Sequence, residues 1–565
     1  MSSPVLRDLE MSSESPSTDE KQDRELSSAP PSEDVKLETA EDTEPAPKSV
    51  PTAQEHEWVT GFKLLTIMTA VTLVALLMLL DTSIVVTAIP RITSQFHSLP
   101  DVGWYGSAYQ LACAAIQPLT GRVYMNLPSK WTFMGFFFVF EIGSLICAVS
   151  NSSKMLIVGR AIAGLGTSGI LNGAFTIISG CVPMSRRPTM LGIVMGVSQV
   201  GLAAGPLIGG ALTEYTTWRW CFYINLPIGG VVAIMLAFVH IPEPIQKAPF
   251  LTAIKTLPGK LDLIGFALFA PSAIQLLLAL QYGGNEFSWH SSQVIGLFCG
   301  AGATFIVFLA WDYRKGDAAM IPFAMIRRRI VWSSSLSYGF LMGQIFCASY
   351  YLPIYFQGVK GVSPLMSGVY VLPSILSHLI VALISGKIIE RVGYYLPIII
   401  ISASLMAVAN GLLSMLAPGT STGKWIGYQI LLGAARGFGL QVPIIAVQNV
   451  LPPPQIPVAT ALVMFSQTFS GALFLSLSDT IFTNSLRTLI LDYAPSVNPQ
   501  SVIDAGATGF RSTLSATDLG NVLIAYAKSV DRVFYLTTGM ACGCFLFSWG
   551  MGWKNIRKKE TVSNA

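Results

Sequence analysis

Residues 159–166 read Gly159-Arg160-Ala161-Ile162-Ala163-Gly164-Leu165-Gly166, and residues 433–439 read Gly433-Ala434-Ala435-Arg436-Gly437-Phe438-Gly439. Each stretch places one arginine and a Gly-x-Gly inside a long apolar run. Two other apolar runs, at a nearly equal offset in the chain, are followed by Gly121-Arg122 and Gly386-Lys387. The chain is therefore predicted to contain two related halves, an architecture typical of transporters that expose a central site to one side of a membrane and then to the other.

The composition is that of a membrane protein. Of 565 residues, 52% are hydrophobic and 12% are charged, against roughly 25% charged in an average soluble domain. Fifteen of the 31 acidic residues, but only five basic ones, precede Trp58. We expect residues 1–57 to form a disordered acidic cytoplasmic tail, because this composition cannot bury enough apolar surface to fold. This composition argues against a secreted enzyme and against a nucleic-acid-binding protein.

Apolar runs of about 20 residues predict fourteen transmembrane helices in an all-α polytopic protein. The runs are 62–90, 102–124, 131–150, 155–180, 189–213, 219–241, 262–283, 294–313, 331–357, 366–389, 394–416, 425–449, 456–481 and 531–553. Their arrangement is read as 6+2+6. The predicted parts are a six-helix half at 58–241, two inserted helices and their flanking loops at 242–330, a second six-helix half at 331–553 with an outer loop at 482–530, and a basic cytoplasmic tail at 554–565.

The distribution of basic residues predicts the orientation. With the N-terminus in the cytoplasm, the short inner loops carry fourteen Lys and Arg residues and the short outer loops carry five. Inner loops of membrane proteins are enriched in these residues, which favours this orientation over its inverse.

Four stretches resemble the major facilitator superfamily, specifically the fungal fourteen-helix drug:proton antiporters of the toxin and multidrug efflux type. They are residues 80–92 in the first helix, the stretch around Arg160, the glycine-rich residues 196–210, and residues 218–229 at the start of the sixth helix. The resemblance covers about residues 58–553 and implies a major facilitator fold and proton-coupled export. The loop 121–130 departs from the family pattern because it lacks an acidic residue.

Asp81 and Arg160 are the candidate proton-coupling residues. A charged group inside the membrane usually faces a cavity or a partner. Asp81 either loads a proton or makes a structural hydrogen bond. Arg160 either pairs with a carboxylate such as Asp81, receives a proton through water, or braces two helices. Glu141 is interpreted as a structural acid, and Asp479, at the outer end of a span, as a solvated one.

The resemblance also implies which residues line the cavity and which move. The expected cavity residues are Asn172, Gln344, Tyr350, Tyr351 and Gln441, each of which has ordinary helix packing as its alternative role. The expected packing and hinge element consists of Gly201, Gly205, Pro206, Gly209 and Gly210, because closely spaced glycines let helix backbones approach. The expected inner-loop gating residues are Arg122, Lys130, Lys387, Glu390 and Arg391. Arg122 and Lys130 are expected to contact a neighbouring helix end or a carboxylate, and Glu390 and Arg391 are the candidate charge latch of the second half.

Several chemistries are absent from the sequence. There is no Gly-x4-Gly-Lys-Ser/Thr for ATP, no hydrolase motif, and no cysteine framework for a metal or a disulfide set. We therefore expect no enzyme activity, no metal and no cofactor beyond the proton motive force. The expected partners are a small-molecule substrate, protons and the lipid bilayer, with no nucleic acid and a monomeric state.

The function predicted is proton-coupled efflux of small organic molecules such as secondary metabolites, mycotoxins or drugs, at the plasma membrane, with the vacuolar membrane as an alternative. A transporter of basic amino acids or siderophores and a non-transporting sensor are the other readings.

Overall fold

The computed structural model describes residues 58–97, 101–243, 247–284, 287–505, 509–512 and 514–557. Within these ranges the regular structure is helical, with two isolated β-bridges. The predicted tail 1–57 and residues 558–565 lie outside the described residues.

The part of the bundle predicted to be the first half, and called so below, contains seven helical segments. They are α1 (Gly61–Phe96), α2 (Val102–Asn126), α3 (Ser129–Ala148), α4 (Ser153–Cys181), α5 (Arg187–Tyr215), α6 (Trp220–Tyr223) and α7 (Asn225–Phe238). Glycines allow the close packing of α3 on α4, since a Cβ built at Gly143 would lie 2.3 Å from the backbone nitrogen of Ala163. Small residues play this role in membrane bundles because the lipid supplies no hydrophobic drive for helix association.

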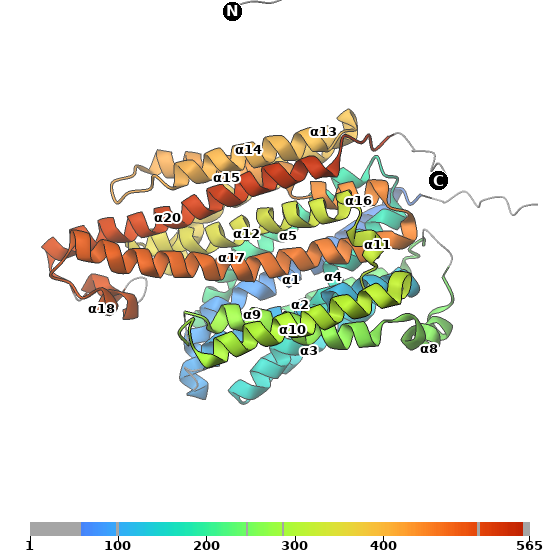
Figure 1. Ribbon diagram of the computed structural model, residues 1–565, viewed down its shortest axis with the longest axis horizontal. Helices are drawn as coiled ribbons and strands as arrows, with labels where there is room; N and C mark the ends of the chain where they lie inside the picture. Colours follow the sequence, from blue (N-terminus) through green and yellow to red (C-terminus); the bar gives the residue numbers. More distant parts are fainter. Residues whose placement is uncertain are drawn as a thin grey trace, which may run out of the picture. The chain divides into compact units, whose positions relative to one another are not determined.

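The segment predicted to be inserted, called the inserted segment below, begins with α8 (Phe250–Lys260) and continues with α9 (Leu263–Tyr282), α10 (Ser292–Lys315), η2 (Gly316–Ala318) and α11 (Phe323–Ile326). The helix α9 starts at Asp262, whose carboxylate caps it by accepting a hydrogen bond from the Gly265 backbone nitrogen at 3.0 Å. Figure 1 shows α9 and α10 side by side, and α9 also packs on α2 of the first half and on α17 of the second.

The second half contains α12 (Arg329–Gly358), α13 (Pro364–Val392), α14 (Leu396–Leu413), α15 (Thr422–Gly439), α16 (Val442–Val450), η3 (Pro453–Gln455), α17 (Ile456–Tyr493), α18 (Pro499–Asp504), η4 (Phe510–Ser512), α20 (Ala516–Ser548) and η5 (Trp549–Met551). The helix α12 packs on α17 and α20, and α13 packs on α15 and across the halves on α5.

Twelve stretches among the described residues are long and apolar enough to cross a membrane. The helices α2 and α12 are not among them, although they are 25 and 30 residues long. Both carry polar side chains that face the interior of the bundle, including Gln117 on α2 and Gln344 on α12, and these lower their mean hydropathy. The count of fourteen spans and the 6+2+6 arrangement stay predictions.

The segment 482–530 differs from the outer loop expected there. The helix α17 continues to Tyr493 and α20 starts at Ala516, with α18 between them. A buried apolar cluster explains the extension, because Leu486 and Ile490 of α17 pack with Val522 and Tyr526 of α20. Both helices lengthen because each offers an apolar stripe to the other.

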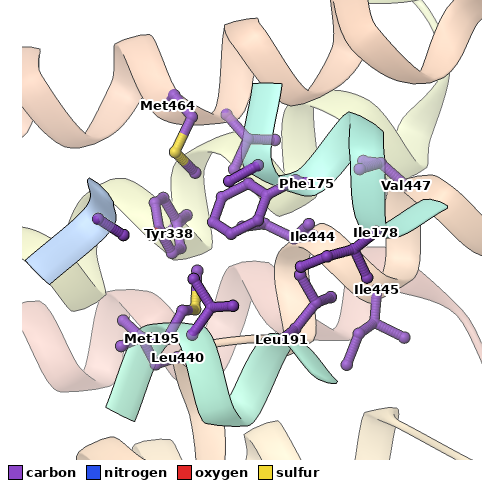
Figure 2. Packing of buried hydrophobic residues seen from close by; sticks show 14 of the residues in the cluster. Phe175, Ile178, Leu191, Met195, Tyr338, Leu440, Ile444, Ile445, Val447 and Met464 are labelled. Carbon is purple, nitrogen blue, oxygen red and sulfur yellow. The ribbon is translucent and has the colours of Figure 1, made fainter. Parts of the chain in front are cut away.

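The largest buried cluster joins the two halves at the end of the bundle where α1 begins, and we call its central part the seal. Figure 2 shows these side chains meeting from both halves. The first half contributes Phe175 and Ile178 of α4 with Leu191 and Met195 of α5, and the second half contributes Tyr338, Leu440, Ile444, Ile445, Val447 and Met464. At this end the halves are in direct apolar contact.

Candidate functional site

A cavity of about 420 Å³ lies between the halves, beyond the seal. Four helices, α4, α5, α12 and α17, contribute residues to both the seal and the cavity. On each of them the cavity residues lie farther than the seal residues from the end of the bundle where α1 begins. Along α4 the cavity-lining Thr167 and Leu171 are farther from the α1-start end than Phe175, and along α17 the lining begins at Gln467, after Met464. The cavity therefore occupies the part of the bundle toward the end of α1, and the seal closes it at the other end.

The cavity lining combines apolar surface with amide and hydroxyl groups. Its polar residues are Thr82, Ser107, Tyr109, Gln110, Gln117, Thr167, Gln199, Gln281, Tyr350, Tyr351, Gln467, Thr468, Ser476 and Asp479. Asp479 is the one carboxylate in this lining, which contains no Lys, Arg or His. The prediction that Asp479 is a solvated residue at the end of a span is wrong in its location, because α17 continues for fourteen residues past it and its side chain lines the cavity.

Asp81 and Arg160 form a buried ion pair beside the cavity. Arg160 Nη1 lies 2.6 Å from Asp81 Oδ2, and the two side chains are 2% and 0% exposed. Arg160 Nε donates to the carbonyl of Tyr105 at 2.9 Å, and its guanidinium lies 4.4 Å from the ring centre of Tyr109. A charge-assisted hydrogen bond and a ring face thus hold the arginine where water cannot solvate it.

Tyr109 connects this pair to the cavity. Its ring covers Arg160 on one side, its side chain lines the cavity, and its hydroxyl shares a 2.7 Å hydrogen bond with Thr167, another lining residue. Thr82, the neighbour of Asp81, also lines the cavity. A change in the charge of Asp81 can therefore reach the cavity wall through one aromatic residue.

Asn225 completes the site, and our residue-by-residue reasoning missed it. Its Nδ2 donates to Asp81 Oδ1 at 3.2 Å and to Ser144 Oγ at 3.1 Å. Glu141, one turn before Ser144 on α3, has two buried oxygens without a hydrogen-bond partner among the described residues. The stretch 218–229 contained the signal, because it places one amide in an otherwise apolar helix.

Two of the five expected cavity residues line the cavity. Tyr350, which is 55% exposed, and Tyr351, which is 1% exposed, are part of its wall. Asn172, Gln344 and Gln441 are not part of this lining and are fully buried between helices, which is the alternative role of helix packing.

These three amides link helices instead of facing the cavity. Asn172 donates to Thr120 of α2 at 3.0 Å, Gln344 accepts from Asn410 of α14 at 2.8 Å, and Gln441 donates to Ser385 of α13 at 3.2 Å. The lining includes instead the glutamines of α2, α5, α9 and α17. A sequence signal for two of them exists, because Gln110 and Gln117 are seven residues apart and so share one face of α2.

The glycine-rich stretch of α5 packs on α1 through three of its glycines. A Cβ at Gly201 would lie 2.4 Å from the Leu76 carbonyl oxygen, one at Gly205 1.9 Å from Ser83 Oγ, and one at Gly209 2.5 Å from Thr87 Oγ1. Nothing lies within 4 Å of a Cβ at Gly210, so this residue does not take part in the packing. Pro206 lies inside α5, which stays one continuous helix.

Two expected gating cations hold carbonyl groups near helix ends, which is one of the two kinds of partner expected for them. Arg122 donates to the carbonyls of Asp317, Ala319 and Met320, which follow α10. Lys130 donates to the carbonyls of Ala237 and Val239 at the end of α7, at 2.9 and 2.8 Å. Unpaired carbonyls near helix ends attract cations, which gives these residues partners even though the loop lacks an acid.

The latch expected between Glu390 and Arg391 is absent. Glu390 Oε2 accepts from Thr189 Oγ1 of α5 at 2.5 Å, which links the two halves. Arg391 and Lys387 are exposed. Neighbouring helical residues point in different directions, and so Glu390 faces the first half while Arg391 faces away from it.

Comparison with known proteins gives matches over most of the chain. The family profile described as Major Facilitator Superfamily matches residues 71–475. The chain is 63% identical over 503 residues to the MFS-type transporter pigP of Monascus ruber, and this match covers 89% of this chain and 88% of the relative. It is 49% identical over 513 residues to the efflux pump mokI of Monascus pilosus, with 90% and 94% covered.

Two solved structures share the fold. The proton:xylose symporter XylE has a TM-score of 0.56 at 14% identity, with 86% of this chain and 95% of that chain covered. The human organic anion transporter MFSD10 has a TM-score of 0.54 at 13% identity, with 85% and 100% covered. At these identities the likeness concerns the fold alone.

Proposed function

Because the chain belongs to the Major Facilitator Superfamily, a family of multi-pass membrane transporters rather than enzymes, we propose that it exports small organic molecules in exchange for protons. The observation that carries the proposal is the buried Asp81–Arg160 pair separated from the cavity by the ring of Tyr109. Fungal relatives named efflux pumps support the direction of transport.

The proposed cycle is alternating access. With the N-terminus in the cytoplasm, the seal lies at the cytoplasmic end and the structure corresponds to a state in which the cavity faces outward. Rocking of the halves opens the seal and closes the outer end of the cavity. The glycine contacts of α5 with α1 and the Thr189–Glu390 bond between halves lie where such a motion bends or separates helices.

Proton coupling follows from the charge balance of the site. Deprotonated Asp81 neutralises Arg160, whereas a proton on Asp81 removes that partner and leaves the guanidinium on the Tyr105 carbonyl and the Tyr109 ring. The resulting shift in Tyr109 alters the wall that contacts substrate, so proton and substrate bind in competition. Each proton entering down a potential of 100 mV supplies about 2.3 kcal/mol.

The full membrane topology is also part of this proposal. We count α2 and α12 as spans together with the twelve apolar stretches, which gives fourteen in a 6+2+6 order. Their polar residues face the cavity or other helices rather than lipid, and such residues are tolerated inside a bundle.

The proposed substrates are uncharged, partly apolar secondary metabolites at the plasma membrane. The mixture of leucine, aromatic and amide side chains in the cavity suits molecules of this type. A cationic substrate, such as a basic amino acid, is the second candidate, because Asp479 gives the cavity a carboxylate without a lining cation.

The test is efflux from yeast cells expressing the protein, with Nile red, emodin and rhodamine 6G as probes, with and without a protonophore. Asp81→Asn is compared with Asp312→Asn, a buried aspartate on α10 outside this site. Loss of export with the protonophore and in Asp81→Asn alone supports the proposal. Export that survives the protonophore refutes proton coupling, and absence of flux for every probe in the parent favours a non-transporting sensor.

A further inference from the structure

The seam between α2 of the first half and α17 of the second half changes along its length. Near the seal the two backbones touch, since a Cβ at Gly121 would lie 2.6 Å from the Cα of Val458. Farther along, Thr468 Oγ1 donates to Gln117 Oε1 at 2.9 Å. Beyond that bond, Ser107 of α2 and Ser476 of α17 each form a hydrogen bond with α9 of the inserted segment.

The helix α9 is attached to both sides of this seam. On the side of α2, Gln281 Nε2 donates to Ser107 Oγ at 2.8 Å, and on the side of α17, Ser476 Oγ donates to the Leu280 carbonyl at 2.8 Å. Nearer the seal, the rings of Phe269 and Phe465 lie 5.2 Å apart. One helix from outside the two halves thus bridges α2 and α17 along this part of the seam.

One face of α9 reaches the cavity. Leu277, Leu280 and Gln281 are lining residues. Gln275 lies on another face, where a Cβ at Gly300 of α10 would meet its Oε1 at 2.4 Å. Two residues six positions apart on a helix differ by about 240° in direction, which explains why two glutamines of the same helix have different surroundings.

We propose that α9 is a wall of the substrate site, and that Gln281 with Leu277 and Leu280 selects among substrates. The leucines contact the apolar body of an uncharged molecule, and the Gln281 amide recognises a hydroxyl or carbonyl group on it. The same helix closes the seam against lipid, so substrate does not leave the cavity between α2 and α17. The selection of substrates rests on the proposed function, whereas the position of α9 at the cavity does not.

The first test compares Gln281→Leu with the matched control Gln275→Leu in the efflux assay. Loss of one hydrogen bond changes a binding constant by about two- to tenfold. Gln281→Leu is therefore expected to reduce export of the hydroxyl-rich emodin relative to the apolar Nile red by that factor, while Gln275→Leu leaves the ratio unchanged. An unchanged ratio in Gln281→Leu, or the same change in both variants, overturns the selection role.

The second test does not depend on transport. In a background with Cys113, Cys299 and Cys542 replaced by Ala, Gln281→Cys and Gln275→Cys are treated in lipid nanodiscs with the charged thiol reagent MTSET. Cysteine labelling follows access to water, so Gln281→Cys is expected to react about tenfold faster or more.

Equal labelling rates, or faster labelling of Gln275→Cys, would overturn the proposal that the Gln281 face of α9 lines the cavity. If Gln281→Cys is labelled selectively but the protein exports neither dye, α9 does line the cavity and the proposed export function is refuted. The two failures are therefore distinguishable.

Discussion

Replacement of Gly201 by alanine tests whether the contact of α5 with α1 positions the ion pair. A Cβ at this position would lie 2.4 Å from the Leu76 carbonyl oxygen and 3.1 Å from the Leu80 backbone nitrogen. These are backbone atoms, so no side-chain rotation relieves the overlap. The helices must separate instead, and α1 carries Asp81 directly after Leu80.

The expected cost follows from the size of the overlap. Normal van der Waals contact requires the two backbones to move apart by about half an ångström or more, and overpacking of this kind costs about 1–3 kcal/mol. The shift also lengthens the 2.6 Å contact between Asp81 and Arg160. We therefore expect both a lower thermal unfolding temperature and weaker efflux at equal expression.

Gly210→Ala is the matched control, because it lies in the same stretch of α5 and nothing lies within 4 Å of its Cβ. Its unfolding temperature is expected to equal or exceed that of the parent, since alanine is favoured over glycine in helices by about 1 kcal/mol. The measurements are unfolding of the purified protein in detergent and Nile red efflux from cells. Equal losses in the two variants, or none in Gly201→Ala, would refute the packing argument.

Three further changes test other contacts. Arg160→Leu leaves the carboxylate of Asp81 buried without its cation and is expected to lower stability by about 3–5 kcal/mol. Adding Asp81→Asn should recover part of that loss in a double-mutant cycle of thermal unfolding, and purely additive losses would contradict the pairing. Arg122→Ala removes the donor to the carbonyls of 317–320 and should speed proteolysis of that segment, with Arg122→Lys intermediate; unchanged cleavage would show that the contact does not hold it. Phe175→Ala empties part of the seal at a cost of about 3–5 kcal/mol and should increase MTSET labelling of a cysteine introduced at Met464 in the background with Cys113, Cys299 and Cys542 replaced by Ala, while unchanged labelling would place the barrier elsewhere.

The helices and the ion pair were accessible to sequence reasoning. Long apolar runs are constrained by the backbone, which must satisfy its own hydrogen bonds in lipid, and so their approximate positions follow from composition. A charged group inside such a run needs a partner, which made Asp81 and Arg160 a natural pair. Gly201 packs closely on another helix as its glycine spacing predicts, and the structure identifies that helix as α1.

Residue direction within each helix decided the rest. Asn172 and Gln441 have the residue type and the depth in the membrane expected of cavity residues, yet both face neighbouring helices. The sequence does not predict this direction, because a helix that is apolar on nearly all faces has little periodic pattern to show which face points inward. Tyr350 and Gln281 line the cavity although they come from different parts of the chain.

The sequence by itself determined that this chain is a helical membrane protein in which Asp81 and Arg160 each need a partner or a cavity, since hydrophobic length and the cost of a lone charge are local properties. Only the tertiary structure decided that α17 and α20 extend beyond the apolar runs, that Arg122 holds carbonyls in place of a carboxylate, and that α9 belongs to the cavity. These features depend on which surfaces meet across hundreds of residues. Contacts between distant segments leave no fixed spacing in a single sequence.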